Sequence, residues 1–349
     1  MKQTTIATVG CGVISEIYLQ NLTTRFSNIR VKCCCDLRPE SAQKRAEQFG
    51  IGVSTFEEIL HDPEIEMVVI LTPAPSHYGL IRQALLAGKH VYTEKVLSLT
   101  AKEAKELCVL ANEKRLYLGS APDTFLGAAI QKGGQVLAEG ILGTISGFDV
   151  YVNRNLDQIT NCYPFVRMAG GGILYDYGVY HLTALVHLLG RVKEVCAVVE
   201  NNKPFRVGTV AGTPDFGKEY AFPNEAQVTA ILRMESGVVG TLTLNGESIG
   251  KDLCHFRIYG EKAVLELPDP NCFGGAVRLI GPNVNWEELS NELPYSENSR
   301  GIGPAEMAQA MEEGRPNAAS KEQALHVLSV MESIMESSKT GCFVPVQTA

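Results

Sequence analysis

Short apolar segments alternate with helix-like segments over the first 120 residues of this 349-residue chain, and this alternation constrains its fold more than any other feature. The expected strands cover residues 6–9, 31–35, 67–71, 90–93 and 116–118. Residues 67–71 are apolar without a break, which is typical of a strand covered on both faces. Strands that alternate with helices of about 10–15 residues predict βαβ units and a doubly wound parallel sheet.

Helix boundaries in this region have recognisable signals. A helix should begin at Pro39 and end near residue 50. Ser54 with Glu57, and Thr100 with Glu103, have the spacing of capping boxes, in which each side chain satisfies a backbone N–H of the other residue. Two further helix starts are therefore expected at these positions.

The pattern changes near residue 122. Helices are expected over 125–139 and 173–189, separated by a polar stretch that ends near residue 161. Apolar and polar residues then alternate over 226–233, and strands are expected at 238–244, 256–259 and 263–267, before a final helix capped by Ser320. Two-residue alternation predicts an antiparallel sheet with one polar face. We therefore expect an α/β domain over 1–121 and an α+β domain over 122–349.

Charge and cysteine usage limit the partners. The net charge is −8 without Lys/Arg clusters, which argues against a nucleic acid or an anionic membrane surface. The longest apolar runs are far shorter than the roughly 20 residues that span a bilayer. Residues 4–14 contain two glycines and lack a clear cleavage site, so a strand and turn explain them better than an export signal. Ten cysteines without CxxC spacing favour a reducing, cytoplasmic location and no metal site.

The first expected strand leads into Gly10-Cys11-Gly12-Val13-Ile14-Ser15. A dinucleotide site needs glycines where the chain turns tightly and where the backbone approaches a pyrophosphate, followed by the N–H groups of a helix start. Gly10, Gly12, Val13 and Ile14 are therefore candidate cofactor contacts, although Ser15 replaces the third glycine of the usual fingerprint. A tight turn with a purely structural purpose is the alternative.

The second expected strand ends at Asp36, about twenty residues after the glycines. A carboxylate there would accept hydrogen bonds from the ribose hydroxyls of a dinucleotide. Asp36 would also repel a 2′-phosphate, so NAD is favoured as the cofactor. Arg38 could offset that repulsion, which leaves NADP possible.

Other polar residues follow the later strands, where ligands bind in parallel α/β sheets. Thr72 and Pro73 follow one strand, with His77 shortly after them, and Glu94 and Lys95 follow the next. These five residues are candidate cofactor contacts, and Lys95 would lie near the nicotinamide. A solvated surface lysine is the alternative for Lys95.

Three glycines, residues 170–172, precede the helix expected over 173–189. Asp176 and Tyr180 are four residues apart, so they would share one helical face. An acid, a phenol and Lys95 could together transfer a proton. Alternatively, Asp176 caps the helix and Tyr180 packs in the core.

These motifs, in this order, resemble the glucose–fructose oxidoreductase/inositol dehydrogenase (Gfo/Idh/MocA) family over nearly the whole chain. The resemblance rests on the segments G-C-G-V-I-S, C-D-L-R-P-E, L-T-P-A-P-S-H, G-K-H-V-Y-T-E-K and G-G-G-I-L-Y-D-Y-G, and on the C-terminal helix. It implies an N-terminal Rossmann domain and a C-terminal substrate-binding and oligomerisation domain on an open, mostly antiparallel sheet. It also implies oxidation or reduction of a sugar, polyol or related compound.

The resemblance assigns catalytic roles to Lys95, which would bind the reacting hydroxyl, and to Asp176. Many members of the family have a catalytic histidine at the position of Tyr180, and a subset has tyrosine there. Tyr180 is therefore our preferred acid/base, and His181 is the alternative. Val96 replaces the proline that follows the lysine in the family. A cis bond before a residue other than proline costs about 2.5–4 kcal/mol, so we expect a trans Lys95–Val96 bond.

Three further residues are candidate substrate contacts alongside Lys95, Asp176 and Tyr180. Asp123 lies in a segment that resembles a substrate-facing loop of one family branch, although it could equally cap the next helix. Tyr163 and Arg167 precede the glycine run and could close over the substrate, or belong to a surface loop.

The combined prediction is an NAD(P)-dependent oxidoreductase that acts on a sugar, polyol or glycoside and forms a homodimer or homotetramer. One alternative is a redox-neutral enzyme that retains NAD and uses transient oxidation to eliminate a group. The other is a non-catalytic dinucleotide sensor. A sensor need not keep Lys95, Asp176 and a phenol together, which argues against it.

Overall fold

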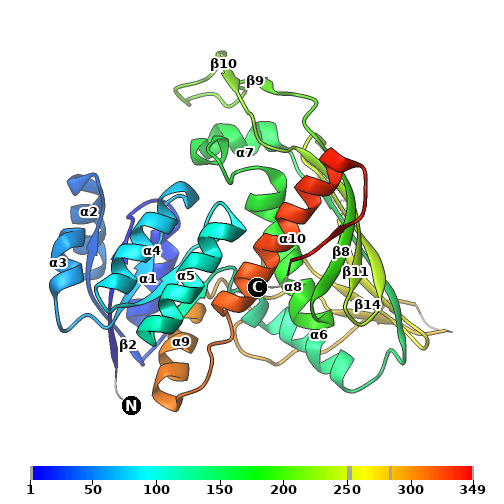
Figure 1. Cartoon of the computed structure of the whole chain (residues 1–349), viewed down its shortest axis with the longest axis horizontal. Coiled ribbons are helices and arrows are strands. Elements are labelled where there is room, and N and C mark those ends of the chain that lie inside the picture. The colour runs from blue at the N-terminus through cyan, green and yellow to red at the C-terminus, as the bar shows by residue number, and fades with distance from the viewer. Residues whose placement is uncertain (1–2, 250–253, 283–284, 348–349) are drawn as a thin grey trace. The chain divides into compact units, whose positions relative to one another are not determined.

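The computed structural model describes residues 3–249, 254–282 and 285–347, and the chain divides into two compact units (Figure 1). The first contains Met1–Leu126 and Asn298–Leu325, and the second contains Gly127–Glu297 and His326–Ala349. The units differ from the expected division at residue 121 in one main respect. A segment late in the sequence belongs to the first unit, which periodicity along the chain could not indicate.

A six-stranded parallel sheet forms the first unit, in the order β3-β2-β1-β4-β5-β6. This order confirms the predicted doubly wound sheet. Its strands are β1 (Thr4–Val9), β2 (Ile29–Cys35), β3 (Gly52–Val53), β4 (Met67–Ile70), β5 (His90–Thr93) and β6 (Leu118–Ser120).

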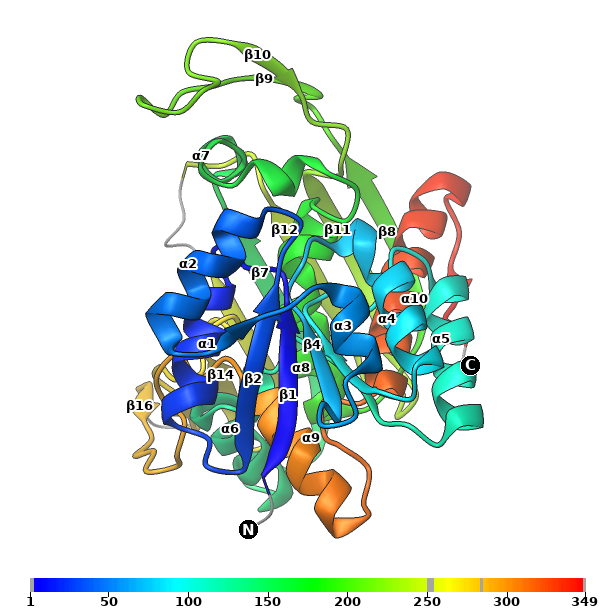
Figure 2. The same ribbon diagram turned by 90° about the vertical axis from the view of Figure 1, so that its left-hand side faces the viewer.

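Helices cover both faces of this sheet: α1 and α2 lie on one side, and α3, α4 and α5 on the other (Figure 2). Their bounds are α1 (Ser15–Thr24), α2 (Pro39–Phe49), α3 (Phe56–His61), α4 (His77–Leu86) and α5 (Ala101–Lys114), and the late segment adds α9 (Ile302–Glu313), which was not expected.

The capping predictions have different outcomes. Half of the capping box predicted for α5 forms: the Thr100 side chain accepts a hydrogen bond from the Glu103 amide, but Glu103 Oε2 is buried without a partner among the described residues. The prediction for Ser54 was wrong by one residue. Thr55 caps α3 instead, and its side chain and that of Glu58 satisfy each other's backbone N–H groups. Two overlapping sequences there have the same spacing, so the spacing alone could not distinguish them.

A nine-stranded sheet forms the second unit, in the order β16-β15-β14-β13-β7-β12-β11-β8-β17. Its pairs are antiparallel except β7 with β12, which confirms a mostly antiparallel sheet. The bounds are β7 (Ile145–Asn153), β8 (Val192–Glu200), β11 (Gln227–Met234), β12 (Val239–Asn245), β13 (His255–Gly260), β14 (Val264–Leu267), β15 (Arg278–Ile280), β16 (Glu287–Glu288) and β17 (Val344–Pro345).

Helices line one side of this sheet (Figure 1). They are α6 (Ala128–Ala138), α7 (Leu156–Cys162), α8 (Val179–Leu189) and α10 (Lys321–Thr340). Ser320 caps α10 as predicted, accepting a hydrogen bond from the Gln323 amide. The helix expected over 173–189 is divided: a π-helical turn, η4 (Ile173–Gly178), precedes α8. Such turns occur often at functional sites.

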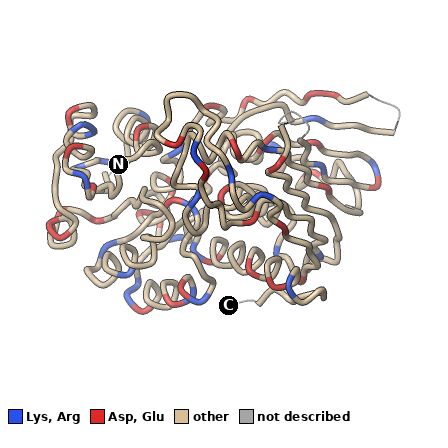
Figure 3. The backbone as a smooth tube through the Cα atoms, turned by 90° about the horizontal axis from the view of Figure 1, so that it is seen from above, with Lys and Arg blue, Asp and Glu red and all other residues tan. Residues whose placement is uncertain are grey.

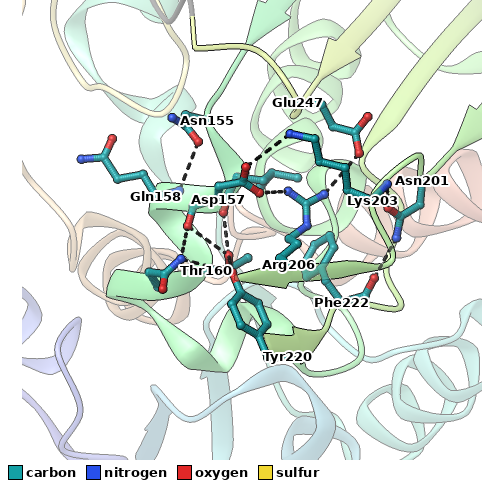
Figure 4. A network of polar contacts seen from close by, with 12 residues as sticks. Asn155, Asp157, Gln158, Thr160, Asn201, Lys203, Arg206, Tyr220, Phe222 and Glu247 are labelled. Carbon is teal, nitrogen blue, oxygen red and sulfur yellow. Dashed lines mark hydrogen bonds and ion pairs between the residues drawn. The ribbon is translucent and has the colours of Figure 1, made fainter. Parts of the chain in front are cut away.

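A hairpin of β9 (Phe205–Val207) and β10 (Glu219–Ala221) extends from the second unit. Its base is held by the buried Arg206, which pairs with Asp157 of α7 and, at 3.3 Å, with Glu247 (Figure 4). The Arg206 guanidinium also lies 4.6 Å from the centre of the Phe222 ring. Paired charges and a stacked ring compensate for the burial of the guanidinium.

Three consecutive cysteines, Cys33, Cys34 and Cys35, are buried in β2. Their burial confirms that they act as small core hydrophobes. Among the described residues, no helix combines the length and apolarity needed to cross a bilayer. Acidic and basic residues are interspersed within each unit (Figure 3).

Candidate active site

The glycine-rich turn between β1 and α1 has the geometry of a phosphate-binding loop. Gly10 has φ +99°, and a Cβ there would lie 2.9 Å from the Leu71 carbonyl carbon, so glycine is required for both conformation and space. A Cβ on Gly12 would meet nothing within 4 Å. Space therefore remains beside Gly12 for a ligand, and the N-cap Ile14 makes no side-chain hydrogen bond to the helix start. These features fit a dinucleotide pyrophosphate.

Ser15, which replaces the third glycine, stabilises this turn. Its hydroxyl donates to the Gly12 carbonyl oxygen at 2.6 Å and accepts from Arg45 Nε at 3.2 Å. Arg45 of α2 also donates to the Gly12 carbonyl oxygen at 3.3 Å. The departure from the fingerprint therefore links α1, α2 and the turn, and it leaves the helix start open.

Asp36 lies at the end of β2, as predicted, and its carboxylate has a structural partner. It accepts the Cys11 N–H at 2.7 Å and the Arg38 N–H at 2.9 Å. Arg38 Nε lies 3.7 Å from the same carboxylate. Asp36 therefore holds the glycine turn against β2, and the neighbouring guanidinium reduces the negative charge that would repel a 2′-phosphate.

His77 is fully buried behind the ends of β4 and β5. Its Nδ1 lies 2.6 Å from the Val96 carbonyl oxygen and its Nε2 lies 2.8 Å from the Thr72 carbonyl oxygen. Burial lowers the pKa of His77, and a neutral imidazole carries a single N–H to donate. His77 therefore holds the segments after both strands through backbone contacts, and its predicted cofactor contact stays a prediction.

Glu94 is also buried, and its predicted cofactor contact stays a prediction. The Tyr18 hydroxyl donates to its Oε1 at 2.8 Å, and the Lys95 N–H donates to its Oε2 at 3.0 Å. Glu94 thus fixes the backbone that carries Lys95, which is partly exposed.

The Lys95–Val96 peptide bond is cis, so the expected trans bond was wrong. That expectation came from the intrinsic preference of an isolated peptide. In the folded chain, Val96 is buried, its carbonyl oxygen contacts His77, and the Lys95 amide bonds to Glu94. These contacts involve residues that local sequence statistics do not include.

Asp123 is buried and caps a helix, although not the next one in sequence. Its Oδ2 accepts N–H groups of Gly301 at 3.2 Å and Gly303 at 3.1 Å, at the start of α9. Burial raises the pKa of Asp123 to about 6. Asp123 therefore caps a distant helix, for which sequence spacing carries no signal, and the suggested substrate contact stays a prediction.

The π-helical turn holds Asp176, and Tyr180 lies in the first turn of α8. Asp176 does not cap this helix, because it lies inside the π-helical turn, and the N-cap residues of the turn and of α8 are Gly172 and Gly178. Asp176 and Tyr180 were expected to share one face of a continuous α-helix. The π-helical turn interrupts that helix between them. Tyr180 is buried, with a ring centroid 6.1 Å from that of Tyr177.

Glu225 holds the start of this turn, and sequence analysis missed it. Its Oε1 accepts the N–H groups of Leu174 at 3.0 Å and Tyr175 at 3.3 Å, and its backbone oxygen accepts from Ile173. A Cβ on Gly172 would lie 2.0 Å from the Glu225 carboxyl carbon. The third glycine of the run therefore makes room for a carboxylate, a function that the glycines alone could not reveal.

Glu225→Gln should change the pH dependence of stability. Burial raises the pKa of Glu225 from 4.5 to about 6. The protonated form is therefore favoured by folding, so this contribution to stability is complete below pH 4.5 and is lost as the pH rises through 6. Relative to wild type, the free energy of unfolding of the variant should rise by about 2 kcal/mol between pH 4.5 and 7. Urea unfolding across this range measures it. Glu261→Gln, at an exposed glutamate, is the control. If the difference in free energy of unfolding from wild type does not depend on pH for either variant, the assignment is contradicted.

His181, the alternative acid/base, is buried beside Tyr177. Its Nδ1 lies 3.4 Å from the Tyr177 carbonyl oxygen, and its ring centroid lies 5.3 Å from that of Tyr177. Burial lowers the pKa of His181, and the charge of Arg154 lowers it further. The imidazole is therefore kept neutral, which suits a packing role better than that of a titrating base.

Tyr163 and Arg167 lie beside the hairpin. Arg167 donates to Asp215 at 2.6 Å and to the Thr160 carbonyl oxygen at 3.0 Å, and its guanidinium stacks 3.6 Å from the Tyr220 ring centre. Tyr163 is 43% exposed, which agrees with the surface-loop alternative. These contacts of Arg167 lie within the network that anchors the hairpin, whereas its buried Nη2 has no hydrogen-bond partner in the part of the chain that the structure describes, so the substrate contact stays a prediction.

Comparison with known proteins agrees with this architecture. Residues 4–121 match the family model described as "Oxidoreductase family, NAD-binding Rossmann fold", and residues 130–266 match the GFO/IDH/MocA C-terminal domain. The first match lies within the first unit and the second match within the second unit. The chain therefore belongs to the Gfo/Idh/MocA family of oxidoreductases.

Relatives in the family are named as dehydrogenases. The chain is 29% identical to trans-1,2-dihydrobenzene-1,2-diol dehydrogenase of Oryctolagus cuniculus over 65% of each chain. It is 26% identical to an NADP-dependent scyllo-inositol 2-dehydrogenase of Bacillus subtilis, over 82% of this chain and 80% of that enzyme. It is 25% identical to the NADP-dependent D-xylose 1-dehydrogenase of Hypocrea jecorina, over 95% and 90%.

Solved structures share the fold across the full length. Levoglucosan dehydrogenase in its apo form superposes with a TM-score of 0.87 at 21% identity, over 100% of both chains. Its complex with NADH superposes with a TM-score of 0.86 at 19% identity, again over 100% of both chains. At these identities the likeness establishes the fold alone.

Proposed function

We propose that this chain is an NAD(P)-dependent dehydrogenase that transfers a hydride between nicotinamide and a carbon of a sugar, polyol or glycoside. The observation that carries the proposal is the open glycine turn at Gly12, anchored by Asp36, within the NAD-binding half of a family whose named members oxidise such hydroxyls. A panel of sugars and polyols, followed by NADH and NADPH absorbance, tests it.

Three residues would carry the proton chemistry. In the oxidative direction, Tyr180 accepts the proton of the substrate hydroxyl and Lys95 donates a hydrogen bond to the same oxygen. Asp176 orients Lys95 or a second hydroxyl of the substrate. Bound NAD supplies the hydride acceptor. His77, Glu94 and Glu225 support the backbone on which these groups stand.

The redox-neutral alternative would use the same residues. Retained cofactor in the purified protein, with product formed but no net NADH, would favour it. The names of the relatives instead favour net hydride transfer, and neither this alternative nor a sensor gains support from them.

Asp36→Ala should shift cofactor preference away from NAD. Removing the carboxylate removes both an acceptor for the ribose hydroxyls and the repulsion of a 2′-phosphate. The ratio of Kd for NADH to Kd for NADPH should rise roughly 10–100-fold, the range expected for losing a charged hydrogen bond. Fluorescence titration measures it. Because Asp36 also holds the Cys11 amide, both affinities can fall, so the ratio decides. An unchanged ratio would place the ribose elsewhere.

We propose that the chain forms a homodimer or homotetramer in the cytoplasm. The sheet face turned away from the helices has exposed apolar residues on β8, β11 and β12: Val198 at 61%, Ile231 at 42% and Val239 at 41% exposure. Covering such residues stabilises an assembly. Light scattering at micromolar concentration should give twice or four times the mass of 37.9 kDa, and a monomer would refute the assembly. Cell fractionation tests the location.

A further inference from the structure

Arg154 is a cation whose guanidinium has no ion pair among the residues that the structure describes. It follows β7 directly, and its backbone N–H donates to the Asn245 carbonyl oxygen at 2.8 Å. Its Cζ lies 3.7 Å from the centre of the Tyr177 ring. The backbone bond and the stacking limit the positions that the side chain can take.

Asp269, which accepts the hydroxyl of the Tyr177 ring under Arg154, and two carboxylates close to Arg154 or to its partner Asn245 in sequence, Asp157 and Glu247, already have other partners. Asp269 accepts the Tyr177 hydroxyl through one oxygen and the Asn271 N–H through the other. Asp157 pairs with Arg206 and Lys203 (Figure 4), and Glu247 pairs with Arg206 and accepts from Gln227. The guanidinium has five N–H donors, and no acceptor for them is found within the described chain.

The position of Arg154 relates it to the proposed chemistry. Tyr177, on which it stacks, lies in the same π-helical turn as Asp176 and three residues before Tyr180. Arg154 is only partly exposed, so it differs from a freely solvated surface arginine. A fixed, half-buried guanidinium with uncommitted donors is suited to bidentate recognition of an anion.

We propose that Arg154 binds a carboxylate of the substrate, so that the chain acts on a sugar acid, either an aldonate or a uronate. The inference rests on the proposed dehydrogenase function and narrows its substrate class. One guanidinium matches the single charge of a carboxylate. A phosphate monoester carries about 1.5–2 negative charges and would lie near the carboxylate of Asp269, which bonds to Tyr177, with a single cation to offset both groups.

Matched probes test this assignment. D-gluconate is compared with D-glucitol, and D-glucuronate with D-glucose, with glucose 6-phosphate as a fifth probe. Wild type should show a higher kcat/KM for the acid of each pair. Arg154→Met keeps an apolar chain over Tyr177 but removes the charge, and it should lower the acid-to-neutral ratio of kcat/KM roughly 10–100-fold. Arg154→Lys should retain part of the ratio. Arg233→Met, at an exposed arginine paired with Glu194, should leave it unchanged.

Thermal shifts with each probe in the presence of NADH give a readout that does not depend on turnover. If the acids raise the melting temperature of wild type but not of Arg154→Met, the inference is supported. If, in addition, no probe is oxidised, the inference stands and only the proposed dehydrogenase function fails. Oxidation of neutral sugars with no preference for acids overturns the inference and leaves the dehydrogenase function standing. Preference for the phosphate, absence of any acid-induced shift, or an equal loss for acids and neutral sugars in Arg154→Met also overturns it.

Discussion

Lys95→Met should reduce kcat roughly 10²–10⁴-fold, the range typical of groups that act on a proton in the transition state. The lysine follows the carboxyl end of β5, and ligands bind beyond the carboxyl ends of the strands in this architecture. Methionine keeps a similar length without the charge, so the substrate oxygen would lose its hydrogen-bond donor. Stopped-flow or steady-state rates with an identified substrate measure the effect.

The cofactor affinity separates a chemical role from a structural one. The Kd for NADH should change less than threefold in Lys95→Met, because the glycine turn and Asp36 lie after other strands of the sheet. The exposed Lys114→Met on α5 serves as the control and should have the wild-type rate. Near-normal turnover in Lys95→Met would show that Lys95 is a solvated surface lysine without a catalytic role.

Elements whose signals are local were predicted well. The strand β5 begins and ends at the expected residues, and α2 begins at Pro39 because proline suits the first turn of a helix. The strand β4 is apolar throughout and buried throughout. In each case the cause of the structure lies within the segment itself.

Elements that depend on distant partners were missed. The strand β7 lies inside the stretch that was expected to be polar, because Ser146 is exposed and Asp149 only partly buried while Phe148 and Val150 are buried. The helix α9 begins where Asp123, far away in the sequence, accepts its N–H groups. The isomer of the Lys95–Val96 bond likewise depends on contacts that include His77, nineteen residues away.

The candidate site follows the same division. Gly10, Asp36 and Asp176 could be proposed as site residues because turn chemistry, strand ends and motif order are visible in sequence. Glu225 and Arg154 were not, because they reach the π-helical turn from other elements. Arg167 could not be assigned from sequence, since its partner Asp215 lies in a hairpin that has no strong strand signal.

Tyr180→Phe should remove most of the activity, whereas His181→Asn should leave a measurable rate. A free phenol in water has a pKa of about 10, and only the deprotonated form can accept the proton of the substrate hydroxyl. Oxidation by wild type should therefore accelerate as the pH rises from about 7 to 9. Tyr180→Phe should flatten this profile, since phenylalanine has no ionisable group. Tyr78→Phe on α4 is the matched control.

The imidazole would give a different profile. Burial lowers the pKa of His181, so this residue is already neutral at pH 7 and should contribute no alkaline limb. In His181→Asn the alkaline limb should remain, with a lower rate if the packing against Tyr177 is disturbed. If His181→Asn abolishes turnover while Tyr180→Phe retains both the rate and the limb, the proton acceptor is the imidazole, one residue further along α8.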